Sequence, residues 1–232
     1  MYENNKELQD AWQLFHKELV KVKYAYNFEW LGLQILKVPQ DIIALQEIIW
    51  EVKPNLIIET GVACGGSIMF SATMLIALQA CGEISCGHVV GIEINLYPEN
   101  KKAILEHPLS KNITLLEGSS VDYNIRKKVY EIAKGKRVLI YLDSNHTHEH
   151  VLKELILYSE LISVGGYIIV EDTGIEDLPN WFSSNRPWGK GNNPKTAVYE
   201  FLKQTNEFEI DKEIDSKLIL TGSPDGYLRR VK

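Results

Sequence analysis

Four polar residues stand directly after two apolar runs, and their types could bind a metal ion and move a proton. Asp143 and His146 follow the run RVLIYL, and Glu171 and Asp172 follow the run GYIIV. Neither run alternates apolar with polar residues, which is typical of strands buried on both faces of a parallel sheet. Ligands of open α/β sheets bind outside the carboxyl ends of the strands, so we expect the four side chains to meet there. Converging carboxylates repel one another without a cation, and such oxygen ligands favour Mg²⁺. The alternative is that these acids are a helix cap and ordinary loop residues.

The elements that must position these residues alternate along the chain. From Pro54 onward, strand candidates alternate with helix candidates, which predicts a doubly wound α/β sheet with right-handed crossovers. Two further strand candidates, FEIDKEI and KLILTG, follow the last helix and are predicted to pair antiparallel. The earlier strands are NLIIE, HVVGIEI, NITLLEG, RVLIYLD and GYIIVED, with helices near residues 65–80, 98–107, 121–134, 147–163 and 194–205.

Residues 1–53 are predicted to form a helical extension packed on a core domain of residues 54–232. One helical stripe in this extension is apolar and predicts a face that docks on the core. A second helix is predicted from about Asp41 to Val52, where Trp50 is expected to be buried. The stripe consists of Leu8, Trp12, Phe15, Leu19 and Val22.

Residues 173–193 interrupt the alternation, with two Trp, two Pro, three Gly and no periodicity. A loop this long in a compact domain is usually functional or disordered, and its aromatic content favours a lid. Two roles stay open for Trp181 and Trp188: stacking on the apolar face of a sugar, or pinning the loop to the body.

Composition narrows the class of protein. The net charge of −6 argues against a nucleic-acid partner, which needs a basic face. No apolar run reaches 18 residues and the N-terminus is polar, so we expect neither a membrane span nor a signal peptide. The three cysteines, Cys64, Cys81 and Cys86, are odd in number and lack metal-finger spacing, which favours a reduced, cytoplasmic compartment.

A glycine-rich turn links the first strand of the sheet to the next helix. Gly61 permits a close approach of the backbone, and the Gly65–Gly66 pair frees the helix N-terminus to bind an anionic group. Glu93 ends the second strand, where an acid can accept both hydroxyls of a ribose. Ser119 and Ser120 follow the third strand and could edge an adenine ring. The turn does not spell G-x-G-x-x-G, which weakens a dinucleotide interpretation.

These motifs together resemble known methyltransferases. The string E-x-G-x-x-C-G-x-S at Glu59–Ser67 is similar to the cofactor loop of catechol O-methyltransferase. Longer strings resemble the cephalosporin hydroxylase / rhamnosyl O-methyltransferase family from about Trp30 to the C-terminus. They are WLGLQILKVPQ, PNLIIETGVACGGS, LDSNHTHEHVLKEL, GYIIVED and PDGYLRR.

The resemblance implies a class I methyltransferase with a seven-stranded, Rossmann-like sheet, mostly parallel with an antiparallel C-terminal strand. It implies methylation of a hydroxyl on a sugar or small natural product, dependent on S-adenosylmethionine and Mg²⁺, as in cell-surface glycan or antibiotic biosynthesis. Relatives of this kind tend to form homo-oligomers. The "hydroxylase" label is a poor guide, because non-haem iron oxygenases use two His and one carboxylate, normally on a barrel-like scaffold.

The resemblance also implies roles for individual residues. His146 follows Asp143 by three residues, the spacing of the catalytic Lys in catechol O-methyltransferase, and is the candidate general base. His148 and His150 are expected to be capping or surface residues. The other implied groups are Glu59, Gly61, Ala63 and Ser67 at the methionine end of the cofactor, Glu93 at its ribose, Ser119 and Ser120 at its adenine, Asp143 beside it, and Asp143, Glu171 and Asp172 on the metal.

Two other functions compete with this one. A nucleotide-dependent oxidoreductase would need the dinucleotide fingerprint and usually a Tyr-x-x-x-Lys pair, and the sequence has neither. A non-catalytic member that binds a ligand or scaffolds a biosynthetic complex is the alternative outside enzymes. It is disfavoured because every implied catalytic position is filled.

Overall fold

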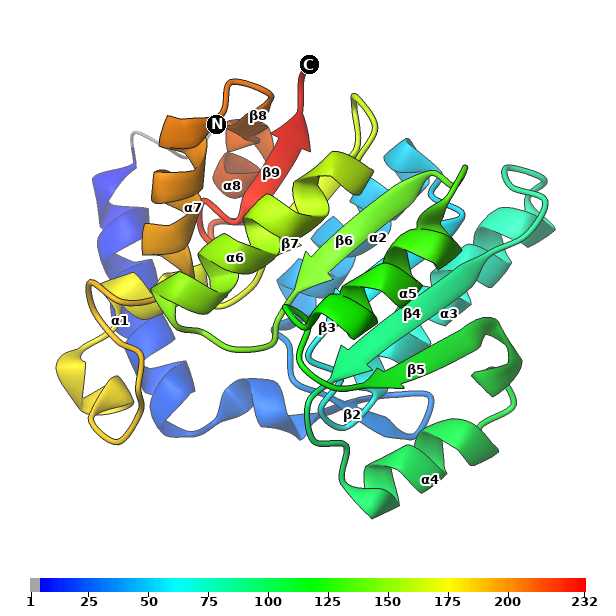
Figure 1. Ribbon diagram of the computed structural model, residues 1–232. Helices are drawn as coiled ribbons and strands as arrows, with labels where there is room; N and C mark the ends of the chain where they lie inside the picture. The colour runs from blue at the N-terminus through cyan, green and yellow to red at the C-terminus, as the bar shows by residue number, and fades with distance from the viewer. Residues whose placement is uncertain (1–4) are drawn as a thin grey trace.

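The computed structural model describes residues 5–232, and it places a single large sheet between two layers of helices (Figure 1). The strands are β1 (Phe28–Trp30), β2 (Leu33–Ile35), β3 (Leu56–Thr60), β4 (His88–Glu93), β5 (Ile113–Glu117), β6 (Val138–Leu142), β7 (Tyr167–Val170), β8 (Phe208–Ile210) and β9 (Tyr227–Arg230). The α-helices are α1 (Lys6–Lys21), α2 (Pro39–Val52), α3 (Gly66–Ala80), α4 (Pro98–Glu106), α5 (Tyr123–Ala133), α6 (His148–Tyr158), α7 (Pro194–Gln204) and α8 (Lys212–Leu218). Short 3₁₀ turns are η1 (Tyr24–Asn27), η2 (Ser110–Asn112), η3 (Ser159–Leu161), η4 (Thr173–Asp177) and η5 (Asn180–Ser183).

The large sheet has seven strands in the order β5-β4-β3-β6-β7-β9-β8. The neighbours from β5 to β7 pair in parallel, and β9 pairs antiparallel with both β7 and β8. The predicted doubly wound, mostly parallel sheet with an antiparallel C-terminal strand is therefore confirmed. The strand order reverses between β3 and β6, and the carboxyl ends of these two strands form the switch point at which such folds bind ligands.

Two hydrophobic cores flank the sheet because successive side chains of each strand point to opposite faces. In β3, Ile57 packs with α2 and α3 on one face, whereas Leu56 and Ile58 pack with α5, α6 and α7 on the other. Every residue of β3 and β6 is buried. This two-sided burial explains why the strand sequences read as unbroken apolar runs.

The C-terminal strands differ from the prediction. FEIDKEI and KLILTG do not pair with each other, because residues 212–218 form α8, and β8 pairs instead with β9. Asp211 caps α8 by accepting hydrogen bonds from the backbone N–H groups of Glu213 and Ile214. This local cap favours helix over strand. Leu228 of β9 is fully buried in the second core, which makes YLRR the stronger strand.

The N-terminal residues are only partly packed on the body. No residue of α1 is buried, and Phe15 and Val22 of the predicted docking stripe are 52% and 68% exposed. The tract expected to lead into α2 contains a β-hairpin, β1 with β2. α2 itself contributes Ile48 and Ile49 to the first core, although Trp50, expected to be buried, is 45% exposed.

Across residues 5–232, none of the helices combines the length and the apolar character that crossing a bilayer requires.

Candidate functional site

Asp143, His146 and Asp172 lie together at the carboxyl edge of the sheet, after β6 and β7. One ligand atom from each lies within 4.8 Å of the other two, a spacing that could hold a metal ion. His146 Nδ1 lies 3.4 Å from Asp172 Oδ2, and the Asp172 side chain is half exposed. Burial raises the pKa of Asp143, while the nearby Lys37 ammonium opposes that shift. The convergence predicted for these three residues is thus present in the structure.

Glu171 faces a different partner, a buried lysine. Lys37 Nζ lies 3.0 Å from Asp143 Oδ2 and 3.3 Å from Glu171 Oε2, with the lysine side chain only 4% exposed. The hydroxyl of Tyr141 donates a 2.5 Å hydrogen bond to Glu171 Oε1, and the lysine ammonium lies 4.4 Å from the centre of the same tyrosine ring. Both carboxylate oxygens of Glu171 are therefore engaged by Lys37 and Tyr141.

Lys37 was not identified as a site residue from the sequence, although its place in the sequence is unusual. It is a single cation at the end of the apolar tract WLGLQIL, just before α2. Burial disfavours its charge, but the carboxylates of Asp143 and Glu171 outweigh that effect and raise the pKa of Lys37 above its usual value. Lys37 is therefore the internal counter-ion of the site.

The predicted cofactor loop lies beside these acids, at the end of β3. Gly61 has φ +85°, and a Cβ there would meet the backbone oxygen of Asp143 at 1.9 Å. The close approach predicted for Gly61 is thus an approach to the neighbouring strand end. A Cβ on Gly66 would lie 2.4 Å from the Gln34 carbonyl oxygen of β2. The missing side chain at Gly66 admits the N-terminal hairpin, which places that hairpin over the loop.

Glu59 is the buried acid at the base of this loop, 1% exposed. Its Oε1 accepts a hydrogen bond from the Ser67 hydroxyl, whereas Oε2 has no hydrogen-bond partner within the described part of the chain. Burial raises the pKa of Glu59 to about 8, and the Ser67 hydrogen bond only partly opposes this. A buried acceptor without a partner is costly, so its presence points to a ligand that supplies a donor.

This burial makes a prediction about stability and pH. An acid with a raised pKa keeps its proton in the folded state after the unfolded chain has lost it, so stability falls as pH rises between the two values. For Glu59 this interval runs from about 4.5 to about 8. Urea unfolding at several pH values should therefore show that the free energy of unfolding of Glu59→Gln falls less steeply with rising pH than that of wild type across this range. Parallel pH profiles for the two proteins would contradict the burial argument.

The other predicted cofactor residues line the same edge. Glu93 Oε2 accepts hydrogen bonds from the backbone N–H groups of Val62 and Ala63, at 3.0 and 3.2 Å, so it also shapes the loop. Ala63 is exposed, with φ +45°. Ser119 is half-buried and Ser120 is buried after β5.

His150 is not the surface residue that we expected. Its Nε2 lies 3.0 Å from the Ser120 hydroxyl and 3.5 Å from Glu154 Oε1, and Glu154 is fully buried. Glu154 Oε1 also accepts a 2.7 Å hydrogen bond from the Ser144 hydroxyl. One face of α6 thus connects the loop after β5 with the loop after β6.

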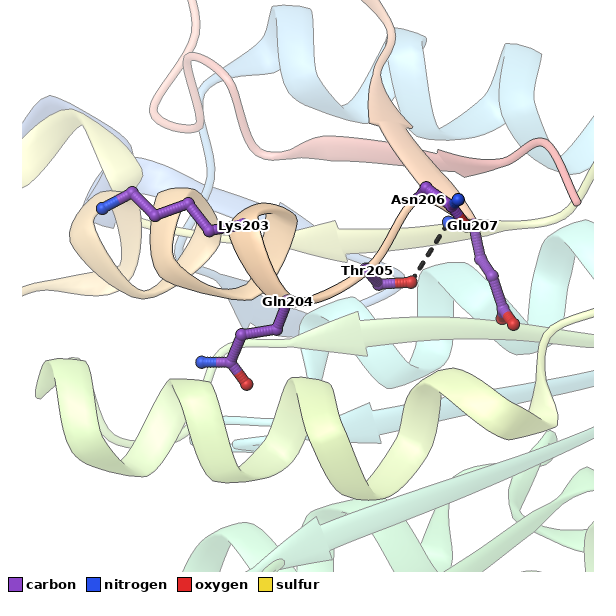
Figure 2. Close-up of a pocket in the computed structure, with 5 residues that line it drawn as sticks. All are labelled: Lys203, Gln204, Thr205, Asn206 and Glu207. Carbon is purple, nitrogen blue, oxygen red and sulfur yellow. Dashed lines mark hydrogen bonds between the residues drawn. The ribbon is translucent and has the colours of Figure 1, made fainter.

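A hollow elsewhere on the surface lies away from this site. Figure 2 shows Lys203–Glu207 around it, where α7 leads into β8, with the backbone N–H of Glu207 donating a 3.1 Å bond to the Thr205 hydroxyl. Because β8 runs parallel to β7, the start of β8 lies at the opposite edge of the sheet from the acids. The hollow is therefore separate from the acidic site that contains Asp143.

Comparison with known proteins places the chain in a family. The family model described as Rhamnosyl O-methyltransferase/CmcI matches residues 22–231, nearly the whole chain. The chain belongs to this family. The resemblance found in the motifs is thereby confirmed.

Individual members of the Rhamnosyl O-methyltransferase/CmcI family resemble the chain over most of its length. It is 28% identical over 222 residues to the rhamnosyl O-methyltransferase of Mycobacterium tuberculosis (strain ATCC 25618 / H37Rv), covering 93% of this chain and 82% of that protein. Identity to the rhamnosyl O-methyltransferase of Mycobacterium leprae (strain TN) is 25% over 208 residues, covering 87% and 82%.

Solved structures share the fold. The structure of CmcI-D160 with Mg and SAM matches with a TM-score of 0.59 at 23% identity, covering 89% of this chain and 78% of that one. The O-methyltransferase from Bacillus cereus in complex with SAH matches with a TM-score of 0.54 at 14% identity, covering 86% and 81%. The class I methyltransferase fold predicted for this chain agrees with both.

Proposed function

We propose that this protein is an O-methyltransferase that transfers the methyl group of S-adenosylmethionine to a hydroxyl of a sugar, with the help of Mg²⁺. The observation that carries the proposal is the meeting of Asp143, His146 and Asp172 at the switch point, beside the loop that begins at Glu59. Relatives named rhamnosyl O-methyltransferase support the acceptor class, and the Mg and SAM of CmcI-D160 support both cofactors.

The donor set of the site fits a hard divalent cation. Two carboxylates and one imidazole with ligand atoms within 4.8 Å suit such an ion, and the carboxylates favour Mg²⁺. Asp143 and Asp172 would hold it. Glu171 stays a predicted third ligand, and it would have to exchange its contacts with Lys37 and Tyr141 for contact with the ion.

The loop after β3 fits the cationic end of S-adenosylmethionine. The free Oε2 of Glu59 supplies an acceptor for the ammonium group of the methionine moiety. The remaining assignments stay as predicted from the sequence. They are Gly61, Ala63 and Ser67 beside the methionine moiety, Glu93 at the ribose, and Ser119 with Ser120 at the adenine.

Methyl transfer is an in-line displacement, in which the acceptor oxygen, the methyl carbon and the sulfur lie on one line. Bound S-adenosylmethionine supplies an activated methyl group, and bound Mg²⁺ lowers the pKa of the acceptor hydroxyl. His146 accepts the hydroxyl proton at Nε2, because its Nδ1 faces Asp172. Asp143 and Asp172 fix the acceptor side of the site, and the Glu59 loop fixes the donor side, so the chain supplies the alignment.

Cofactor identity is tested by binding. Wild type is expected to bind S-adenosylmethionine and its demethylated product with Kd near the micromolar range, about −8 kcal/mol. Glu93→Ala should weaken binding by about 1–3 kcal/mol, because a carboxylate that accepts ribose hydroxyls is lost. Isothermal titration measures both proteins, with NAD as the control ligand. Unchanged affinity in the variant would contradict the assignment.

We further propose that residues 1–53 are additional to the catalytic domain of residues 54–232, and that the segment of this extension before Pro39 contributes to a homo-oligomer. Its exposed apolar side chains support this, among them Phe15 and Tyr26, both 52% exposed, and Leu31, 55% exposed. Deleting residues 1–27, which leaves the hairpin β1–β2 and Lys37 in place, should lower the subunit number measured by size-exclusion chromatography with light scattering. A soluble product with the parental subunit number would refute this part of the proposal.

We also propose that the protein is located in the cytoplasm. Cys64, Cys81 and Cys86 are all free, which supports a reducing, cytoplasmic location.

A further inference from the structure

A row of aromatic rings leads away from His146 along the loop between β7 and α7. The centroid of the Trp188 ring lies 5.4 Å from that of His146, the Phe182 ring 5.8 Å from Trp188, and the Trp181 ring 6.3 Å from Phe182. Trp181, Phe182 and Trp188 are here called the aromatic strip. Phe182 and Trp188 are half-buried and Trp181 is 48% exposed. The strip therefore begins beside the acidic site and ends in solvent.

The loop has polar anchors at its base that do not involve these rings. Glu176 Oε2 accepts hydrogen bonds from the backbone N–H of Gly191 at 2.8 Å and from Asn193 Nδ2 at 2.5 Å. Asn192 Oδ1 accepts a 2.9 Å bond from the backbone N–H of His148. Because these contacts tie the base of the loop to itself and to α6, the aromatic rings beyond it are not needed as its anchor.

The position of the strip matches where an acceptor must lie. In the proposed reaction the acceptor hydroxyl sits beside Asp143, His146 and Asp172, so the rest of that molecule extends from there. Trp188 is the aromatic side chain in contact with His146, and the guanidinium carbon of Arg186 lies 5.6 Å from the centre of the Trp188 ring. Aromatic faces bind the C–H face of a sugar ring, and a nearby guanidinium supplies donors for its hydroxyls.

We propose that the aromatic strip is the acceptor subsite and that it stacks on the apolar face of a sugar ring. This inference rests on the proposed function, because it takes the acceptor hydroxyl to lie beside Asp143, His146 and Asp172. It assigns to Trp181 and Trp188 the stacking role that their sequence left open.

Binding of methyl α-L-rhamnopyranoside without turnover tests the subsite. Saturation-transfer NMR with the full chain and S-adenosylhomocysteine should show transfer to the ring C–H protons and to the C6 methyl group. Trp188→Ala and Trp181→Ala should each weaken binding about tenfold, and Trp188→Phe should retain most of it. Trp50→Ala is the matched control, because Trp50 has a similar exposure of 45% but lies on α2.

Three results would overturn the subsite. The first is absence of saturation transfer in wild type, and the second is equal transfer in wild type and both alanine variants. The third is a parallel loss of S-adenosylhomocysteine affinity in those variants, measured by isothermal titration, since it would mean that the rings hold the loop in place. Rhamnoside binding is measured without turnover, so it tests the subsite independently of cofactor binding. If wild type binds no S-adenosylhomocysteine, that result would contradict only the proposed function.

Discussion

Asp172→Asn is expected to lower methyl transfer by about a hundredfold or more while leaving affinity for S-adenosylhomocysteine nearly unchanged. Asp172 contributes one of the carboxylates that meet within 4.8 Å. Its substitution would remove an anionic ligand of the Mg²⁺ that would activate the acceptor hydroxyl, an effect of several kcal/mol. In the proposed site the cofactor would lie on the Glu59 loop, so its binding would not need this carboxylate. Initial rates and isothermal titration on the same preparations measure the two effects.

The control for this prediction is Glu51→Gln. Glu51 has a side-chain exposure of 56%, close to the 50% of Asp172, and it pairs with Arg229 away from the cluster. It should behave as wild type. A chelator should abolish activity in wild type, and added Mg²⁺ should restore it. Activity that survives both chelation and Asp172→Asn would show that the acids are structural.

His146→Ala tests whether His146 acts as the general base or as a ligand of the metal. A positioned base contributes about 10²–10⁴-fold to the rate, so turnover should fall by this factor. Mn²⁺ binding, followed by electron paramagnetic resonance, should persist if His146 acts only as the base. Loss of Mn²⁺ binding would place His146 among the metal ligands, because one of its ring nitrogens lies in the same cluster.

Lys37→Met is expected to lower the free energy of unfolding by about 3–5 kcal/mol, the usual cost of removing one partner from a buried ion pair. Lys37 is the counter-ion of Asp143 and Glu171, and its side chain is 4% exposed. Without it, both carboxylates lack a cation in a buried site that also holds Glu59. Urea unfolding monitored by circular dichroism measures the change.

Lys217→Met provides the matched comparison. Lys217 pairs with Glu47 on the surface with 59% of its side chain exposed, and such pairs contribute about 0–1 kcal/mol. The deficit of Lys37→Met should shrink as pH falls, because the unpaired carboxylates then take up protons in the folded state. Equal effects of the two substitutions, or a deficit independent of pH, would mean that Lys37 is not the counter-ion of the site.

Much of the fold was readable from local patterns. The strands from β3 to β7 were predicted within a few residues, because a strand buried on both faces is an unbroken apolar run. In the C-terminal segment, FEIDKEI contains β8 as predicted, whereas KLILTG forms no strand, because Asp211 caps α8 and this helix extends into that tract. The hairpin β1–β2 was missed, because three-residue strands carry too little pattern to detect.

The sequence by itself determined that Asp143, His146 and Asp172 meet, because the ends of neighbouring parallel strands lie at one edge of the sheet. Only the tertiary structure decided the different surroundings of the adjacent Glu171 and Asp172. Asp172 has φ +56° and is half exposed beside His146, whereas Glu171 is buried against Lys37. Lys37 is 106 residues from Asp143 in the sequence, and no local pattern specifies such a contact. The contact arises because α2 packs against one face of the sheet, which brings Lys37, two residues before its first residue Pro39, to the acids.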